Sequence, residues 1–346
     1  MLASAAGIAQ NAPMPPAPSL SSPIVIAHRG ASGFRPEHTL AGYELAIDQG
    51  ANVIEPDLVP ARDDVLVARH ENEISGTTDV ADHPEFATRR TTKTIDGQTE
   101  TGWFTEDFTL AELKTLRAKE RLPKVRPANA TYDGRFEIPT LAEIIALAKR
   151  RHVAIYPETK HPTYFAKIGH PTDLLLVNQL QAAGWDSPDA PVFLQSFEVA
   201  NLKRIHKLTK VRLIQLLAGA GAPADGAQPS YAAMITPAGL REVATYAWGI
   251  GPDKAQLWDG ADPTRASSLV ADAHAAGLRV HPWTYRAENM FLPARFRRGG
   301  DPIAHGDVAG EMGSALRQGI DGFFTDFPVI GVRTRDAYVA ERTKAR

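Results

Sequence analysis

The fold of this 346-residue chain is decided by the run Ile24-Val25-Ile26-Ala27-His28-Arg29-Gly30 and by the way that its pattern returns later. Four apolar residues in succession predict a short buried strand, and the basic and glycine residues after them predict a loop at its end. Residues 39–49 then have the apolar spacing of a helix, which Gly50 ends. A strand, a polar loop and a helix therefore form the first unit.

The same alternation continues along most of the chain. Apolar runs that begin at residues 24, 52, 153, 191, 211, 247, 278 and 322 predict eight strands. The spacing between them predicts helices over 39–49, 141–150, 172–183, 197–206, 238–246, 263–276 and 308–318. Eight strands that alternate with helices predict an α/β fold, the TIM (β/α)8 barrel, whose active site lies at the C-terminal ends of the strands.

One segment after the second strand does not fit the repeat. Only a few residues separate that strand from the run 65–70, too few for a parallel crossover, so 65–70 is predicted to fold back as an antiparallel β-hairpin arm. Residues 71–138 are rich in Thr, Asp, Arg and Pro, with one helical stretch over 110–117, and predict a small insertion. We expect a leader over 1–22 and a single barrel domain over 23–346 that contains this insertion.

Composition excludes several classes of protein. The net charge of −2 argues against a nucleic-acid partner, and the absence of cysteine excludes disulfides, thiolate metal sites and cysteine nucleophiles. No window of 18 consecutive apolar residues predicts a membrane span. The leader has no charged residue and is rich in Ala, Ser and Pro, which favours the remnant of an export signal and a periplasmic or secreted enzyme. A disordered leader on a cytoplasmic protein is the alternative.

Ionisable and aromatic residues gather at the predicted strand ends. In chain order the ends carry His28 and Arg29, Glu55 and Asp57, Glu158 and Lys160, Gln195 and Phe197, Trp283 and Arg286, and Asp326, with His70 at the end of the hairpin arm. Side chains alternate along a strand, so Glu55 and Asp57 are predicted to point the same way. A barrel brings all these ends to one mouth.

This set of residues has the chemistry of phosphodiester hydrolysis. Three carboxylates (Glu55, Asp57, Glu158) suit a divalent cation such as Ca²⁺ or Mg²⁺. Two histidines (His28, His70) suit general acid–base catalysis, and Arg29 and Lys160 suit a bound phosphate. The other nine histidines are set aside: His38, His83, His152, His161, His170, His206, His274, His281 and His305.

Seven blocks of sequence carry a resemblance to a known family. They are Ala27–Gly33 with Pro36–Thr39, Glu55–Val59, His70, Tyr156–Lys160, Gly249–Asp253, His281–Thr284 and Gly322–Pro328. As a set they resemble the glycerophosphodiester phosphodiesterases, and within them the exported or periplasmic branch.

The resemblance implies a TIM barrel that hydrolyses small-molecule glycerophosphodiesters, such as glycerophosphocholine, to sn-glycerol 3-phosphate and an alcohol. It implies that His28 and His70 form the acid–base pair, and we assign His28 as the acid and His70 as the base. The resemblance also implies metal ligands at Glu55, Asp57 and Glu158, with Ca²⁺ expected and Mg²⁺ as the alternative, and phosphate contacts at Arg29 and Lys160. It further implies that Trp283 lines the glycerol pocket, and to this substrate pocket we add Gln195 and Phe197 from the neighbouring strand end.

Two departures and two alternatives accompany the resemblance. The family often has Asp where this chain has Glu71, and Pro56 within a central strand predicts a local irregularity. A phospholipase D-like hydrolase of lysophospholipid or sphingomyelin is one alternative, because related barrels share the paired histidines and the Glu-x-Asp motif. A non-catalytic surface binding protein on the same barrel is the other. The oligomeric state is left open.

Overall fold

The computed structural model describes residues 22–260 and 264–344. Apart from Ser22, the leader lies outside these residues, so the leader, the export and the exported branch stay predictions. The eight predicted barrel strands are present, and two of them are split into halves. They are β1 (Ile24–His28), β2 (Val53–Glu55) with β3 (Asp57–Pro60), β7 (Ala154–Ile155) with β8 (Glu158–Thr159), β9 (Phe193–Ser196), β10 (Arg212–Leu217), β11 (Gly249–Pro252), β12 (Arg279–Val280) and β13 (Gly322–Thr325).

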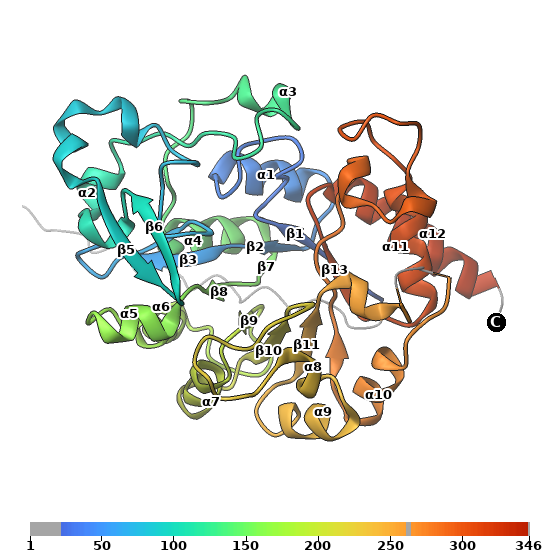
Figure 1. Ribbon diagram of the computed structural model, residues 1–346. Helices are drawn as coiled ribbons and strands as arrows, with labels where there is room; N and C mark the ends of the chain where they lie inside the picture. The colour runs from blue at the N-terminus through green and yellow to red at the C-terminus, as the bar shows by residue number, and fades with distance from the viewer. Residues whose placement is uncertain (1–21, 261–263, 345–346) are drawn as a thin grey trace, which may run out of the picture.

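The barrel strands are parallel and form a ring (Figure 1). One sheet has the order β13-β1-β2-β7, and the other has the order β12-β11-β10-β9-β8-β3 followed by the arm β4 (Leu66–Ala68). Backbone hydrogen bonds join the two sheets at both ends. The Ile155 amide donates to the Pro191 carbonyl at 2.9 Å, and the Tyr285 amide donates to the Phe324 carbonyl at 2.9 Å. The predicted TIM barrel is therefore confirmed.

Prolines cause the two interruptions of the barrel wall. Pro56 separates β2 from β3, which belong to different sheets, so the predicted irregularity is present. Pro157 separates β7 from β8 in the same way, although a break was predicted only at Pro56. A proline cannot donate to the neighbouring strand, which explains both breaks. Glu55, Asp57 and Glu158 are the residues that flank them.

Helices connect the strands on the outside of the barrel. They are α1 (Leu40–Asp48), α4 (Leu141–Arg151), α5 (Pro162–Lys167), α6 (Thr172–Ala182), α7 (Val199–Leu208), α8 (Tyr231–Met234), α9 (Pro237–Val243), α10 (Leu269–Ala275), α11 (Val308–Arg317) and α12 (Pro328–Lys344). Short 3-10 turns lie at Lys254–Leu257, Asn289–Phe291 and Ala294–Phe296. The helix predicted over 263–276 begins only at Leu269, because Ala266 forms an antiparallel bridge with Trp258; Pro263 lies outside the described residues.

The segment 71–138 has a small core of its own. It contains a hairpin of β5 (Thr91–Ile95) and β6 (Gln98–Gly102), the short helices α2 (Leu110–Leu113) and α3 (Pro127–Ala130), and 3-10 turns at Val80–Asp82, Pro84–Arg89 and Thr105–Asp107. Buried Phe86, Trp103 and Phe108 lie in one apolar cluster with Val67 of the arm, and the arm pairs antiparallel with β3 as predicted. The helix predicted over 110–117 ends at Leu113, because the Arg117 amide turns to the Asp79 side chain.

Two apolar clusters make the rest of the barrel rigid. A large cluster fills the layer between the strands and the outer helices, and a smaller one fills the barrel interior around Tyr156, Phe193 and Phe324. The interior is thus a solid platform below the strand ends. Among the described residues, none of the helices combines the length and the apolar character that a membrane span requires.

Candidate active site

A cavity of about 280 Å³ lies at the C-terminal ends of the barrel strands. Nine of the ten predicted site residues line it: His28, Arg29, Glu55, His70, Glu158, Lys160, Gln195, Phe197 and Trp283. The tenth, Asp57, lies beside them, because it pairs with Glu158 across β3 and β8. Leu216, Thr284, Arg286 and Phe324 complete the lining. The strand ends therefore meet at one mouth, as the fold predicts.

The turn after β1 fixes His28 and Arg29 at this mouth. Arg29 and Gly30 have φ of 58° and 89°, so the chain reverses at once. A Cβ on Gly30 would lie 2.8 Å from the Gly42 carbonyl carbon in α1, which explains the glycine. The Arg29 amide donates to Glu55 Oε2 at 2.8 Å. The backbone of the turn is thereby tied to a carboxylate of the second strand.

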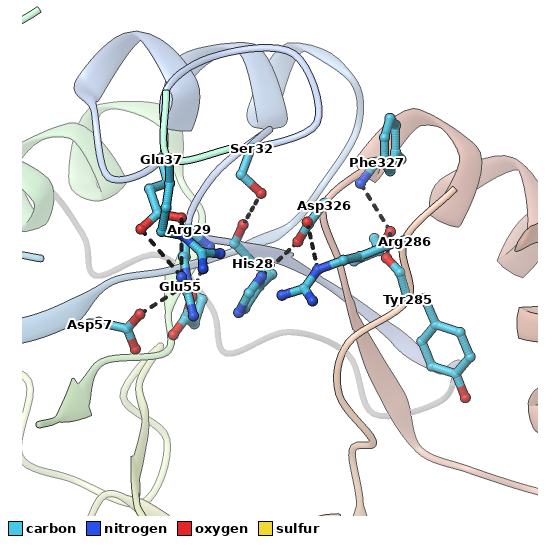
Figure 2. Close-up of polar contacts among 12 residues, drawn as sticks. His28, Arg29, Ser32, Glu37, Glu55, Asp57, Tyr285, Arg286, Asp326 and Phe327 are labelled. Carbon is cyan, nitrogen blue, oxygen red and sulfur yellow. Dashed lines mark hydrogen bonds and ion pairs between the residues drawn. The ribbon is translucent and has the colours of Figure 1, made fainter. Parts of the chain in front are cut away.

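His28 is held through its Nδ1 atom. That nitrogen lies 2.6 Å from Asp326 Oδ1, and Asp326 also accepts hydrogen bonds from Arg126 at 2.6 Å and Arg286 at 3.0 Å. Figure 2 shows the Asp326 carboxylate bonded to both His28 and Arg286. Although burial opposes it, Arg126 and Arg286 hold the pKa of Asp326 well below its usual range, so Asp326 is ionised and the His28 Nδ1–H donates to it. Burial, together with Arg29, lowers the pKa of His28 to about 4.

His70 is held in the same way by a different carboxylate. Its Nδ1 lies 2.6 Å from Glu71 Oε1, and its Nε2 lies 3.3 Å from Lys160 Nζ. An ammonium group can only donate, so Nε2 accepts and Nδ1 carries the proton. Burial lowers the pKa of His70 to about 3, and the positive charges of Arg29 and Lys160 act in the same direction. His70 is thus a neutral imidazole at pH 7 whose Nε2 faces the cavity.

The three carboxylates form one compact group. One oxygen from each of Glu55, Asp57 and Glu158 lies within 4.8 Å of the others, and all three side chains are buried. Burial and the nearby charge of Asp57 raise the pKa of Glu55 well above its usual range. Burial likewise raises the pKa of Glu158 to about 8, with Asp57 adding to the rise and Lys160 opposing it. Such a group of buried oxygens fits a hard divalent cation, which would offset the repulsion.

Other groups bond to this triad. Gln195 Nε2 donates to Glu55 at 3.0 Å, and the other side-chain atom of Gln195, Oε1, is buried without a hydrogen-bond partner among the described residues. Gln195 is therefore anchored through its Nε2. Because Gln195 lines the cavity, its Oε1 is available to accept a hydrogen bond from a bound molecule.

The two predicted phosphate-binding residues carry buried positive charges. Arg29 pairs with Glu37 at 3.1 Å and Asp57 at 3.2 Å, and Lys160 Nζ lies 2.9 Å from Glu158 Oε1. Although burial opposes it, these carboxylates raise the pKa of both groups, so both remain cations. Both cations line the cavity beside carboxylates, where they can meet an anionic substrate.

One wall of the cavity is apolar. The Trp283 ring meets the Phe197 ring edge to face at 5.7 Å, and its Nε1 donates to the Gly251 carbonyl at 2.7 Å. Leu216 and Phe324 lie on the lining as well. The wall suits carbon atoms of a substrate, and Lys160 Nζ lies 5.7 Å from the centre of the Phe197 ring at its edge.

Sequence reasoning gave no role to several neighbours of the site. His38, which is set aside above, is fully buried and places its Nε2 2.9 Å from Asp57 Oδ2, while its Nδ1 lies 2.8 Å from the Tyr43 hydroxyl. His161, also set aside, bonds to Glu71. Asp326 and Arg286 stand at predicted strand ends, but no role was predicted for either. His38 lies in the Pro36–Thr39 block, which is the signal that could have found it.

Comparison with known proteins places these features in a family. The model of the Glycerophosphoryl diester phosphodiesterase family matches residues 28–330. The glycerophosphodiester phosphodiesterase GDPD6 of Arabidopsis thaliana is 37% identical over 327 residues, which cover 89% of this chain and 84% of that protein. The glycerophosphodiester phosphodiesterase of Haemophilus influenzae is 31% identical, with 90% of this chain and 89% of that protein covered.

Solved structures share the fold. A phosphodiesterase of Oleispira antarctica, in complex with the product sn-glycerol-3-phosphate, superimposes with a TM-score of 0.63 at 23% identity and covers 91% of this chain and 97% of its own. The glycerophosphodiester phosphodiesterase of Agrobacterium tumefaciens superimposes with a TM-score of 0.56 at 20% identity, with 89% and 98% covered. At these identities the likeness is one of fold alone.

Proposed function

We propose a substrate and a mechanism for this chain, which belongs to the glycerophosphoryl diester phosphodiesterase family and is a glycerophosphodiester phosphodiesterase. The substrates are small glycerophosphodiesters such as glycerophosphocholine, and the products are sn-glycerol 3-phosphate and an alcohol. One observation carries the proposal. Two carboxylate-held histidines, three clustered carboxylates and two buried cations line or flank one cavity. The Oleispira antarctica relative of similar fold holds sn-glycerol-3-phosphate as its product, which is consistent with this choice.

A divalent cation is the cofactor that fits the carboxylates. Glu55, Asp57 and Glu158 would hold it through oxygen atoms, and Ca²⁺ is our first choice with Mg²⁺ as the alternative. Offsetting negative charge on the phosphoryl oxygens is the chemistry that such an ion supplies when bound. His38 bonds to the Asp57 carboxylate and keeps it oriented toward Glu55 and Glu158.

His70 acts as the base in this scheme. Lys160 lies 3.3 Å from its Nε2 and disfavours a proton there, so the lone pair is free to accept one when Lys160 turns to the substrate phosphate. His70 takes the proton of the attacking water as the water oxygen bonds to phosphorus. Glu71 on Nδ1 stabilises the imidazolium that forms.

His28 acts as the acid. The carboxylate of Asp326 at 2.6 Å favours its protonated form, and the negative charge of a bound phosphodiester would add to that effect. Because its pKa is about 4 in the free enzyme, His28 carries only the Nδ1 proton at pH 7, and in this scheme it takes up a second proton on Nε2 when the phosphodiester binds. His28 then gives this Nε2 proton to the oxygen of the leaving alcohol as the phosphorus–oxygen bond breaks. Arg29 and Lys160 hold the phosphate, while Gln195, Phe197 and Trp283 contact the rest of the substrate.

Alanine variants of the two histidines test this proposal. Turnover of glycerophosphocholine, followed as both choline and sn-glycerol 3-phosphate, should fall at least ~100-fold in His28→Ala and in His70→Ala. His83→Ala is the control, because His83 pairs with Glu85 on the surface of the insertion. Near-normal turnover in either site variant would refute the assigned roles. Release of choline from sphingomyelin, without glycerol phosphate, would instead favour the phospholipase D-like alternative.

A further inference from the structure

The turn of the β5–β6 hairpin reaches the neighbourhood of His70. Asp96 and Gly97 form the two-residue turn, and both have positive φ, 48° and 82°, as a tight hairpin requires. Asp96 Oδ2 lies 2.6 Å from Nδ1 of His161, which directly follows Lys160 in the chain. Figure 1 shows this hairpin beside α5, the helix that begins just after His161. A residue of the insertion therefore contacts the third strand end of the barrel.

His161 continues the contact toward the active site. Its Nε2 lies 3.0 Å from Glu71 Oε2, and the other oxygen of Glu71 lies 2.6 Å from His70 Nδ1. Three hydrogen bonds thus join Asp96, His161, Glu71 and His70 in a row. His161 is the N-cap of α5, directly before Pro162, and has a φ of 46°, an uncommon conformation for a residue other than glycine.

We propose that Asp96 and His161 are positioning residues, which fix Glu71 and through it the ring orientation and tautomer of His70. The inference rests on the catalytic role proposed above for His70. Glu71 needs such an anchor because its side chain is 42% exposed, and an exposed glutamate samples several rotamers. With one oxygen on His161 and the other on His70, a single rotamer is favoured.

Electrostatics supports the arrangement. Both ring nitrogens of His161 face carboxylates, and these hydrogen bonds raise its pKa to about 9 against the opposing effects of burial and Lys160. His161 is therefore a cation between two anions at pH 7. The hydrogen bonds from His161 and His70, although burial opposes them, lower the pKa of Glu71 and keep it an acceptor. Glu100 also faces this cluster and adds negative charge.

The chain offers a matched control pair. His170 Nδ1 lies 2.6 Å from Asp64 Oδ1, the same distance as in the His161–Asp96 pair, and both histidine side chains are 17% exposed. Asp64 also has a positive φ, 60°. Asparagine tolerates this conformation, so Asp96→Asn and Asp64→Asn remove one charge each with equal demand on the backbone.

The experiment compares Asp96→Asn and His161→Asn with Asp64→Asn and His170→Asn in the full chain. We expect kcat for glycerophosphocholine to fall about 10- to 100-fold in the first pair, with KM changed less than about twofold, and to stay normal in the second pair. The double variant of Asp96 and His161 should lose little more than His161→Asn alone, because the residues act in one row. In a His70→Ala background, Asp96→Asn should have no further effect.

Nitrogen-15 NMR of labelled histidine supplies a readout independent of turnover. In the unaltered enzyme His70 should show a protonated Nδ1 and a bare Nε2, and in His161→Asn a mixture of tautomers. The inference is wrong if the Asp96 and His161 variants match the control pair in kcat and keep the single tautomer. Normal turnover of His70→Ala alone would instead reject the proposed role of His70, and the NMR spectra would still decide whether the row orders the ring.

Discussion

Arg126 donates a hydrogen bond of 2.6 Å to Asp326, although the two residues are 200 positions apart. Asp326 is the residue whose carboxylate holds His28, so a side chain of the insertion supports the residue that we propose as the general acid. Arg126 also pairs with Glu288 at 2.7 Å. All three side chains are buried, and their charges depend on one another.

Removal of Arg126 should therefore affect both stability and activity. Arg126→Ala takes the ion pair from the buried Glu288 and one of three side-chain partners from the buried Asp326, and we expect the free energy of unfolding to fall by about 3 kcal/mol. The kcat should fall as well, because Asp326 loses one of the bonds that orient it. Urea unfolding and steady-state kinetics measure the two effects. The control is Arg151→Ala, whose 2.6 Å pair with Asp48 is exposed and should contribute less than about 1 kcal/mol. Equal losses in the two variants would contradict this account.

Metal removal should abolish turnover if the carboxylate triad holds a cation. After dialysis against EDTA we expect turnover to be lost, and to return with Ca²⁺ more fully than with Mg²⁺. Binding should also stabilise the fold, by about 2.7 kcal/mol at 100 times the Kd, which a thermal unfolding scan detects. In Glu158→Gln, added Ca²⁺ should neither restore turnover nor stabilise the fold. Glu85→Gln, on the surface of the insertion, should behave like the unaltered enzyme. Full activity in protein shown to be free of metal would exclude the cofactor.

Trp283 should matter for binding more than for chemistry. Its ring lines the cavity beside Phe197, and its anchor on Gly251 fixes the ring plane. Trp283→Ala removes apolar contact worth about 1.5 kcal/mol, so KM should rise about tenfold while kcat changes little. Trp283→Phe keeps much of the apolar contact, so its KM should lie between those of the unaltered enzyme and Trp283→Ala. A variant that loses kcat and keeps its KM would place Trp283 in the chemical step.

His281 should make the fold sensitive to acid. It is fully buried below the site, with Nδ1 2.8 Å from the Tyr156 hydroxyl, and burial lowers its pKa from 6.5 to about 4. The unfolded chain takes up this proton near pH 6.5 and the folded chain only near pH 4, so stability falls as the pH drops between these values. The loss from this group is at most about 3 kcal/mol.

A variant isolates this contribution. His281→Gln retains a polar group that can reach Tyr156 but has nothing to titrate. His28 and His70 titrate in both proteins, so the difference between the two stability curves belongs to His281. Urea unfolding at pH 7, 5.5 and 4.5 should show a shallower decline for the variant. Parallel curves would mean that His281 does not carry the effect.

The sequence predicts the barrel well because each strand is a short apolar run and the apolar residues of each helix recur at helical spacing. It also predicts most of the site, because a barrel brings strand ends together whatever lies between them. The break at Pro56 can be predicted because proline has no N–H to donate to a neighbouring strand, and the same reason applies to Pro157. The hairpin of 91–102 is harder to predict: its strands are mostly exposed and lack apolar alternation, although Asp96-Gly97 is a turn signal.

The residues that hold the two proposed catalytic histidines cannot be predicted from the sequence in this way. The contacts of Asp326 with Arg126 and of His161 with Asp96 depend on how the insertion packs against the barrel. These pairs join segments far apart in the chain, and no local period or spacing encodes them. His38 is hidden for the same reason, since its bond to Asp57 links the loop before α1 to the second strand.

Two of the contacts between the insertion and the barrel also limit which segments can be exchanged between this enzyme and a relative. Asp96 reaches the end of the third strand and Arg126 reaches the end of the eighth, each beside a different histidine. A chimaera that takes residues 71–138 from a relative would inherit foreign groups at both places, whereas one that exchanges only α12 would disturb neither. Successful grafts of this segment should therefore need His161 and Asp326 to be exchanged along with it.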